Sequence, residues 1–188
     1  PPGLDETAPV QSLPGGADPD DAANVETYGA RKAVCEAALE ERLPGRVLAV
    51  RAGFIVGPHD NTDRFNSWIE RAARPQPFIV PAELDQPVQL IDARDLAAWI
   101  GRMAERRSNG VYNVTGPKRP LNLAAVARDC MAGTGSCATL LPIPSADLEA
   151  AGVEGWQHLS FWLAPDEYGI MQIDVARALV AGLRFRPL

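Results

Sequence analysis

Basic residues are few and scattered in this sequence. Lysine occurs only at positions 32 and 118, and the 188-residue chain carries a net charge of −6 at pH 7. A protein that binds nucleic acid needs a track of Lys and Arg side chains along the phosphates, so we expect no nucleic-acid partner. Hydrophobic residues make up 46% of the chain. No apolar run reaches the roughly 20 residues of a membrane span, so we expect no membrane association.

Cysteine is also rare. Cys35, Cys130 and Cys137 are odd in number and lack the paired spacing of metal ligands. We therefore expect reduced thiols in a cytoplasmic protein and no metal site, with Cys35 in the core of the fold. His59 beside Asp60 matches no zinc pattern and is typical of a loop.

Two missing glycine motifs narrow the chemistry further. The sequence has no Gly-x-Ser-x-Gly turn, which argues against a serine hydrolase. It also has no glycine-rich turn between a strand and a helix, where a dinucleotide pyrophosphate would bind. Gly15-Gly16 and Gly133-Thr134-Gly135 are typical of ordinary turns. We therefore do not expect this chain alone to hold a dinucleotide.

Among the residues that are present, Tyr28 and Lys32 are the most informative. Residues four apart share one face of a helix, and the sequence from Asp21 or Asn24 to Pro44 is typical of a helix. A lysine ammonium on that face favours the phenolate form of the tyrosine, which suits proton transfer near neutral pH. From these residues alone, a surface pair without function is equally compatible with the pattern.

The segment after this helix has the pattern of a buried parallel strand. Residues 47–50 form an unbroken apolar run, and residues 51–58 follow with Gly53 and Gly57, where backbone can approach a ligand closely. Ligands of open α/β sheets bind at the carboxyl edge of the strands. The sequence thus predicts a ligand site just after this strand.

Further elements alternate along the chain. Asp92 is expected to cap a helix whose apolar stripe includes Leu96 and Trp99. Trp156, Phe161 and Trp162 could belong either to a substrate pocket or to the core. The remaining expected elements are strands at 78–80, 88–91 and 111–115, and helices at 61–74, 123–131, 146–150 and 174–181.

Several motifs occur together in a recognisable order: residues 5–9 (Asp-Glu-Thr-Ala-Pro), Tyr28-x-x-x-Lys32, Arg51 six residues before Gly57-Pro58, residues 88–97, and residues 110–116. In this order and spacing, the sequence resembles the extended short-chain dehydrogenase/reductase family, in particular its NAD-dependent epimerase/dehydratase branch. The resemblance implies an α/β fold: the C-terminal part of a Rossmann-type doubly wound parallel sheet, plus a small α/β substrate-binding domain.

The resemblance also implies roles for particular residues. Tyr28 would exchange a proton with the substrate oxygen, and Lys32 would bind the nicotinamide ribose of NAD or NADP. The backbone of Phe54, Ile55 and Val56 would meet the nicotinamide. We add Arg64 as a substrate contact, because a guanidinium suits an anionic or polyhydroxyl ligand. The substrate would be a sugar nucleotide or a small carbonyl or alcohol compound.

The resemblance further predicts how the chain is organised. Residues 1–57 would form the C-terminal part of the dinucleotide-binding domain, and residues 58–188 mainly the substrate-binding region, with 88–105 returning to the first domain. The glycine-rich turn and a catalytic Ser or Thr would lie in a preceding N-terminal portion, and a homodimer through the Tyr28 helix is a further expectation. The alternative is a non-catalytic relative that senses dinucleotides or binds a partner.

Overall fold

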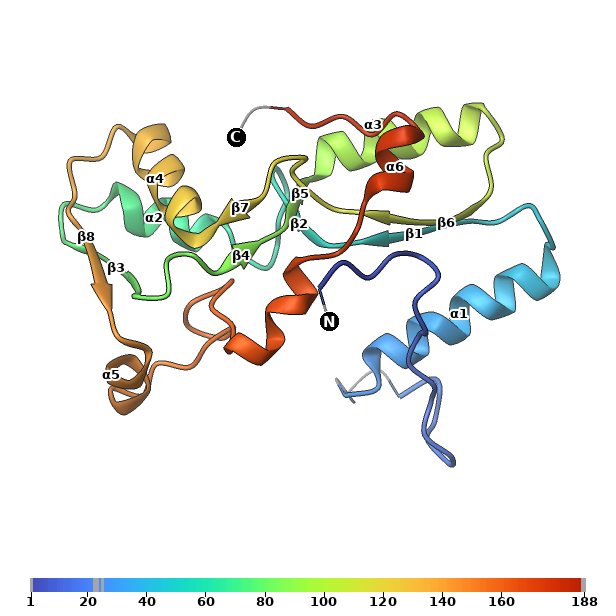
Figure 1. The fold of residues 1–188 in the computed structure, drawn as a ribbon, viewed down its shortest axis with the longest axis horizontal. Coiled ribbons are helices and arrows are strands. Elements are labelled where there is room, and N and C mark those ends of the chain that lie inside the picture. The colour runs from blue at the N-terminus through green and yellow to red at the C-terminus, as the bar shows by residue number, and fades with distance from the viewer. Residues whose placement is uncertain (1, 22–23, 25, 187–188) are drawn as a thin grey trace.

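A computed structural model describes residues 2–21, 24 and 26–186, and shows an α/β fold (Figure 1). The helices are α1 (Tyr28–Arg42), α2 (Asn66–Ala73), α3 (Ala93–Glu105), α4 (Leu123–Thr134), α5 (Ser145–Ala150) and α6 (Ala176–Val180), with a 3₁₀ helix η1 (Pro165–Met171). The strands are β1 (Leu48–Ala52), β2 (Phe54–Val56), β3 (Phe78–Pro81), β4 (Pro87–Val88), β5 (Leu90–Asp92), β6 (Gly110–Val114), β7 (Leu121–Asn122) and β8 (Leu140–Ile143).

The strands associate in pairs, three of which are parallel. β1 pairs with β6, β2 with β5 and β3 with β8 in parallel, whereas β4 and β7 pair antiparallel. Parallel strands need a crossover connection, and α3 connects β5, of the β2–β5 pair, to β6, of the β1–β6 pair. This arrangement confirms the predicted α/β class with parallel strand pairs.

Strand β1 has one partner and one unpaired side. Its hydrogen-bonded neighbour is β6, and no other described strand pairs with it. Four of its five residues are nevertheless half-buried. In Figure 1, α3 lies along one side of the β1–β6 pair and α1 along the other. We call the unpaired side of this strand the open edge of β1.

Helix α1 is poorly covered by the rest of the described chain. It buries only Ala30, whereas Val34, Leu39 and Leu43 are 40%, 52% and 43% exposed. Cys35 is also exposed, so the expectation that it lies in the core is wrong. The physical reason is that no described element packs over this part of α1.

Two hydrophobic clusters form the interior. One centres on Trp68, Phe78 and Phe161, between the helices α2 and α4 and their strands. The other surrounds Trp99 of α3 and packs against β6 and α6. Neighbouring residues of β5 separate them: Leu90 belongs to the first cluster and Ile91 to the second. Successive side chains of a strand point to opposite faces, so this short strand joins both clusters.

Some predicted boundaries hold and others do not. Asp92 caps α3 as expected, because its carboxylate accepts a hydrogen bond from the Arg94 N–H. Neither Asp21 nor Asn24 caps α1, which begins at Tyr28, so those predicted caps are wrong. The Asn24 side chain instead accepts from the N–H of Glu26 at 3.0 Å and forms a local turn.

Candidate functional site

Tyr28 and Lys32 lie together on the first turn of α1. The Lys32 Nζ is 5.4 Å from the centroid of the Tyr28 ring, and Tyr28 is 59% exposed. The spacing of four residues along the helix accounts for the contact. The phenol and the ammonium are therefore both accessible on one face of α1.

One turn further along α1, Glu36 is occupied by Arg51 of β1. The guanidinium donates to both carboxylate oxygens of Glu36, with Nε 3.0 Å from Oε1 and Nη2 2.7 Å from Oε2. The bond to Glu36 raises the pKa of Arg51, which is opposed by partial burial. Glu36 is four residues from Lys32 and would otherwise be its natural ion-pair partner. The bidentate ion pair with Arg51 therefore ties α1 to β1 and leaves Lys32 without an ion pair among the described residues.

The three predicted nicotinamide contacts on β2 face different surroundings. Ile55 is 47% exposed, Val56 is 6% exposed, and the half-buried Phe54 packs its ring against aromatic neighbours. The Phe54 ring centroid lies 4.9 Å from that of Trp156 and 4.8 Å from that of Phe161. The structure therefore leaves Ile55 as the side chain most open to a ligand in this segment.

Arg64, the predicted substrate contact, rests on two of these aromatic rings. Its Cζ is 5.5 Å from the centroid of Phe54 and 5.9 Å from that of Trp156, and its side chain is exposed. A cation over an aromatic face is held in place without losing its hydrogen-bonding groups. The structure thus joins Arg64 to Phe54, but no contact within the described ranges joins this group to Tyr28 or Lys32.

A cavity of about 290 Å³ lies next to Phe54. Its lining includes Gly53, Phe54, Gln89, Thr115 and Trp156. Thr115 Oγ1 is buried and has no hydrogen-bond partner in the part of the chain that the structure describes. Thr115 was not predicted as a site residue, although its place at the carboxyl end of the predicted strand 111–115 is a signal for a ligand contact.

The aromatic residues of the C-terminal region divide between pocket and core. Trp156 is 40% exposed and lines this cavity, whereas Phe161 and Trp162 are 0% and 6% exposed. The structure therefore separates these three aromatic residues by burial and by the cavities that they line. Phe161 packs in the interior, whereas the buried Trp162 also lines, together with Trp156, a further cavity of about 360 Å³.

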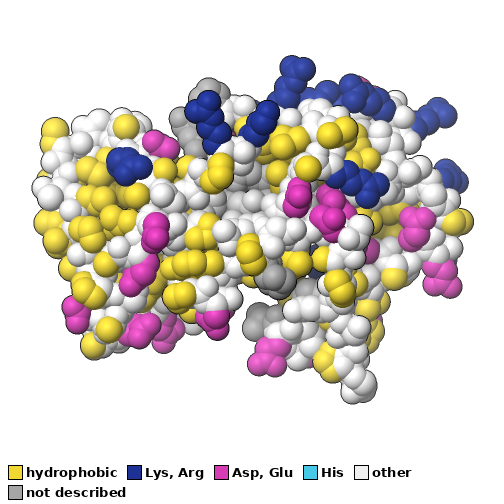
Figure 2. Space-filling model, viewed as in Figure 1, with side chains coloured by type: hydrophobic (Ala, Val, Ile, Leu, Met, Phe, Trp, Pro, Cys, Tyr) yellow, Lys and Arg dark blue, Asp and Glu magenta, His cyan; other side chains and the backbone are white. Residues whose placement is uncertain are grey.

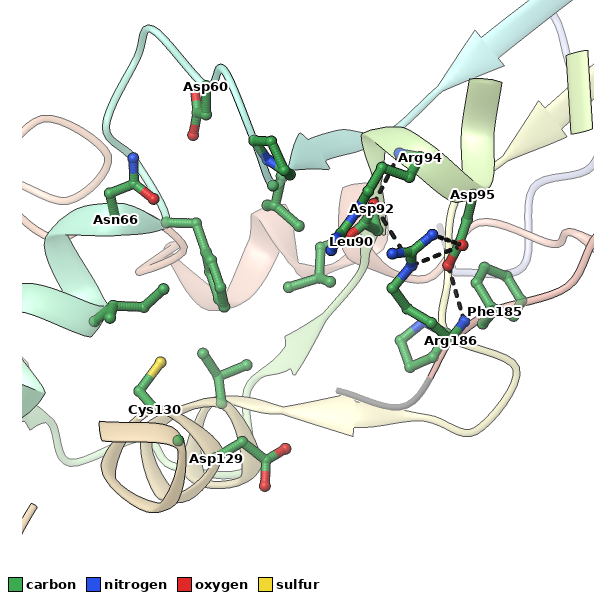
Figure 3. A pocket seen from close by; sticks show the side chains of 18 of the residues that line it. Asp60, Asn66, Leu90, Asp92, Arg94, Asp95, Asp129, Cys130, Phe185 and Arg186 are labelled. Atoms are coloured by element: carbon green, nitrogen blue, oxygen red, sulfur yellow. Dashed lines mark hydrogen bonds and ion pairs between the residues drawn. The ribbon is translucent and has the colours of Figure 1, made fainter. Parts of the chain in front are cut away.

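A larger cavity of about 550 Å³ lies between α2, α4 and the start of α3 (Figure 3). Of the residues predicted to bind cofactor or substrate, only Val56 lines it. Three ion pairs lie at one end of the cavity. Arg94 Nη2 is 2.6 Å from Asp92 Oδ2, Arg186 Nη2 is 2.8 Å from Asp95 Oδ1, and Arg186 Nε is 3.7 Å from Asp92 Oδ1. The hydrogen bond from Arg94 is the main reason that the pKa of Asp92 is lowered.

Charged side chains are unevenly distributed over the surface. Figure 2 shows Lys and Arg gathered along the edge that carries α3, and Asp and Glu mainly elsewhere. Among the described residues, no group of His, Cys, Asp and Glu could hold a metal ion. None of the helices described is long and apolar enough to cross a bilayer.

Comparison with known proteins identifies the fold. No protein-family model and no curated protein matches the sequence. A Burkholderia cenocepacia protein that is named as an epimerase superposes with a TM-score of 0.63 at 19% identity, over 98% of this chain and 53% of that one. The chain has the fold of one half of such a protein. Its parallel pairs and flanking helices agree with this epimerase/reductase fold.

Two cofactor-bound structures share the epimerase/reductase fold. UDP-glucose 4-epimerase of Thermus thermophilus with NAD matches at 18% identity and a TM-score of 0.54, over 93% of this chain and 55% of that one. dTDP-4-dehydrorhamnose reductase of Bacillus anthracis with NADP matches at 19% identity and a TM-score of 0.59, over 85% and 50%. The chain therefore spans about half the length of the structures that it matches.

Proposed function

We propose that this chain is part of an NAD(P)-dependent oxidoreductase or epimerase that acts at a carbinol or carbonyl carbon, with Tyr28 as the acid/base. The observation that carries the proposal is the Tyr28–Lys32 pair. The ammonium is 5.4 Å from the ring centroid, and the phenol is exposed. The fold shared with NAD- and NADP-bound structures supports the same reading.

The residues present fit one end of a dinucleotide. A bound NAD or NADP supplies the hydride acceptor or donor. Lys32 makes no ion pair with a described residue, because Arg51 occupies Glu36, so its ammonium is free for ribose hydroxyls. In this proposal Tyr28, whose ring lies beside Lys32, takes a proton from the substrate oxygen or returns it. The pyrophosphate end would be held by another part of the protein.

The open edge of β1 and the uncovered part of α1 are the surfaces where that other part would dock. An unpaired strand edge is a template for a further strand, and the exposed apolar residues of α1 would be buried by an added layer. We propose an upstream N-terminal portion with the glycine-rich turn and a catalytic Ser or Thr as its occupant. We also propose that α1 forms a homodimer contact. Disulfide cross-linking at the exposed Cys35 tests this contact.

Arg64 is the proposed substrate contact. Its guanidinium is exposed on the rings of Phe54 and Trp156, and no ion pair occupies it among the residues described. A guanidinium presented in this way suits the phosphates or hydroxyls of a sugar nucleotide, or the oxygen of a smaller carbonyl compound. We therefore propose a sugar nucleotide or a small carbonyl or alcohol compound as the substrate.

The test is Tyr28→Phe in the full-length protein. We expect turnover against a panel of carbonyl substrates and sugar nucleotides to fall by about 10²- to 10⁴-fold, as is typical when an acid/base is removed. NADH and NADPH affinity, measured by fluorescence, should change little because the ring remains. Tyr168→Phe is the matched control, since Tyr168 lies on η1 away from α1.

The outcomes separate the alternatives. Unchanged turnover in Tyr28→Phe would refute the acid/base role. A wild-type protein that binds dinucleotide but turns over no substrate in the panel would instead favour the non-catalytic relative.

A further inference from the structure

The larger cavity is a site separate from Tyr28 and Lys32, neither of which lines it. Its volume of about 550 Å³ is in the range that small organic ligands occupy. Apolar side chains from the loop after β2, from β5 and from α4 form much of its wall, among them Phe65, Leu90 and Val126. A ligand that fills it would therefore need an apolar body.

The charges at the cavity do not balance. Four aspartates and two arginines line it. The two arginines pair with the carboxylates at the start of α3, at 2.6 and 2.8 Å (Figure 3). This leaves Asp60 and Asp129 without an ion pair among the described residues. The unpaired charge of the lining is thus negative, which favours a cationic ligand over a neutral or anionic one.

Asp60 offers a specific acceptor. Its Oδ1 accepts two hydrogen bonds from Thr62, from N–H at 2.9 Å and from Oγ1 at 2.5 Å. These bonds to Thr62 are the main reason that the pKa of Asp60 is lowered, so the group is anionic at neutral pH. Its Oδ2 is shielded from solvent and has no hydrogen-bond partner within 3.5 Å among the described residues, although the Phe65 N–H and the charge of Arg64 also contribute to the lowered pKa of Asp60. A ligand N–H would give this shielded anionic oxygen a close, charge-assisted hydrogen bond.

A histidine, His59, and a cysteine, Cys130, are the other titratable residues of the lining. Cys130 points from α4 into the cavity, and burial raises the pKa of its thiol to about 11. A protonated, buried thiol packs as a small apolar group. The thiol therefore adds no charge to the wall, and Asp129 is the other lining carboxylate without an ion pair among the described residues.

We propose that this cavity binds a small apolar amine, with its rings against the apolar wall and its protonated nitrogen donating to Asp60 Oδ2. An ammonium matches both features of the lining, because it carries positive charge and donates several hydrogen bonds. A neutral alcohol of the same shape matches the apolar wall alone.

The probe pair is 2-(1-naphthyl)ethylamine and 2-(1-naphthyl)ethanol, titrated calorimetrically into the full-length protein at pH 7. We expect the amine to bind about tenfold or more tightly than the alcohol, the usual scale of a charge-assisted hydrogen bond. The Asp60→Asn variant should bind the amine only as tightly as it binds the alcohol. Its affinity for the alcohol should equal that of the wild type. Asp147→Asn on α5 is the matched control and should bind the amine as the wild type does.

A second variant locates the site. Gly133 lines the cavity, and a Cβ added to it meets no atom within 4 Å, so Gly133→Leu can enter the cavity without strain. This substitution should lower the binding affinity for both probes about tenfold or more. Gly101→Leu on α3, where a Cβ also meets open space, is the matched control and should not. The proposal is overturned if neither probe binds at millimolar concentration, if Asp60→Asn binds the amine unchanged, or if Gly133→Leu binds both probes unchanged.

Discussion

Gln86 holds the segment that carries the buried aromatic residues onto the core. Its side chain is fully buried, its Nε2 donates to the carbonyl of Phe161, and its Oε1 accepts from the N–H of Leu163 at 3.0 Å. Gln86→Leu keeps a side chain of similar size but removes both bonds. Two backbone groups at residues that are 0% and 4% exposed are then left without partners.

The cost follows from the number of groups orphaned. Each buried, unpaired donor or acceptor costs about 1–3 kcal/mol, so Gln86→Leu should lower the free energy of unfolding by about 2–6 kcal/mol. That is a large part of the 5–15 kcal/mol typical of a domain. Urea denaturation followed by tryptophan fluorescence measures the change in midpoint and slope.

An exposed glutamine provides the comparison. Gln76→Leu alters a residue that precedes β3 on the surface, and it should change the free energy of unfolding by no more than about 0.5 kcal/mol. If Gln86→Leu loses less than about 1 kcal/mol with an unchanged slope, its two bonds do not fix the segment and the reasoning fails.

Two further predictions concern titrating groups. Because the Arg94 hydrogen bond lowers the pKa of Asp92 from its ordinary 3.8, this carboxylate stabilises the fold fully above about pH 4, and the stabilisation is lost as the pH falls through the lowered value. Asp92→Asn should therefore flatten the acid limb of stability against pH, measured by urea denaturation. Since burial raises the pKa of Cys130 to about 11, iodoacetamide at pH 8 should modify the exposed Cys35 and Cys137 first, as checked by peptide mass spectrometry. Modification of Cys130 at an equal rate would contradict its burial.

Local patterns predicted those elements whose stability is decided locally. The apolar runs at 47–50 and 78–80 became β1 and β3, and Asp92 capped its helix. Strand β8 was not predicted, because Pro142 lacks an N–H and weakens the strand pattern. Its pairing with β3 is a contact between residues about 60 positions apart, which no local pattern contains.

The residues of the candidate site likewise differ in whether a local pattern in the sequence could reveal them. Tyr28 and Lys32 could be found from sequence because one helical turn brings them together. Thr115 and Asp60 stand out because each has a buried oxygen without a hydrogen-bond partner in the described part of the chain, and only folding determines which atoms lose solvent. The separation of Trp156 from the aromatic residues of the core is likewise a result of tertiary packing.

The open edge of β1 should also be visible in amide hydrogen exchange. The N–H of Gly53 bonds to the carbonyl of Val114, so the alternate amides of Ala49 and Arg51 point toward β6. The amides of residues 48, 50 and 52 point the other way, where no described strand accepts them. Protection should therefore alternate along β1 in this chain alone, and uniform protection in a longer protein would report that a further strand has joined the sheet.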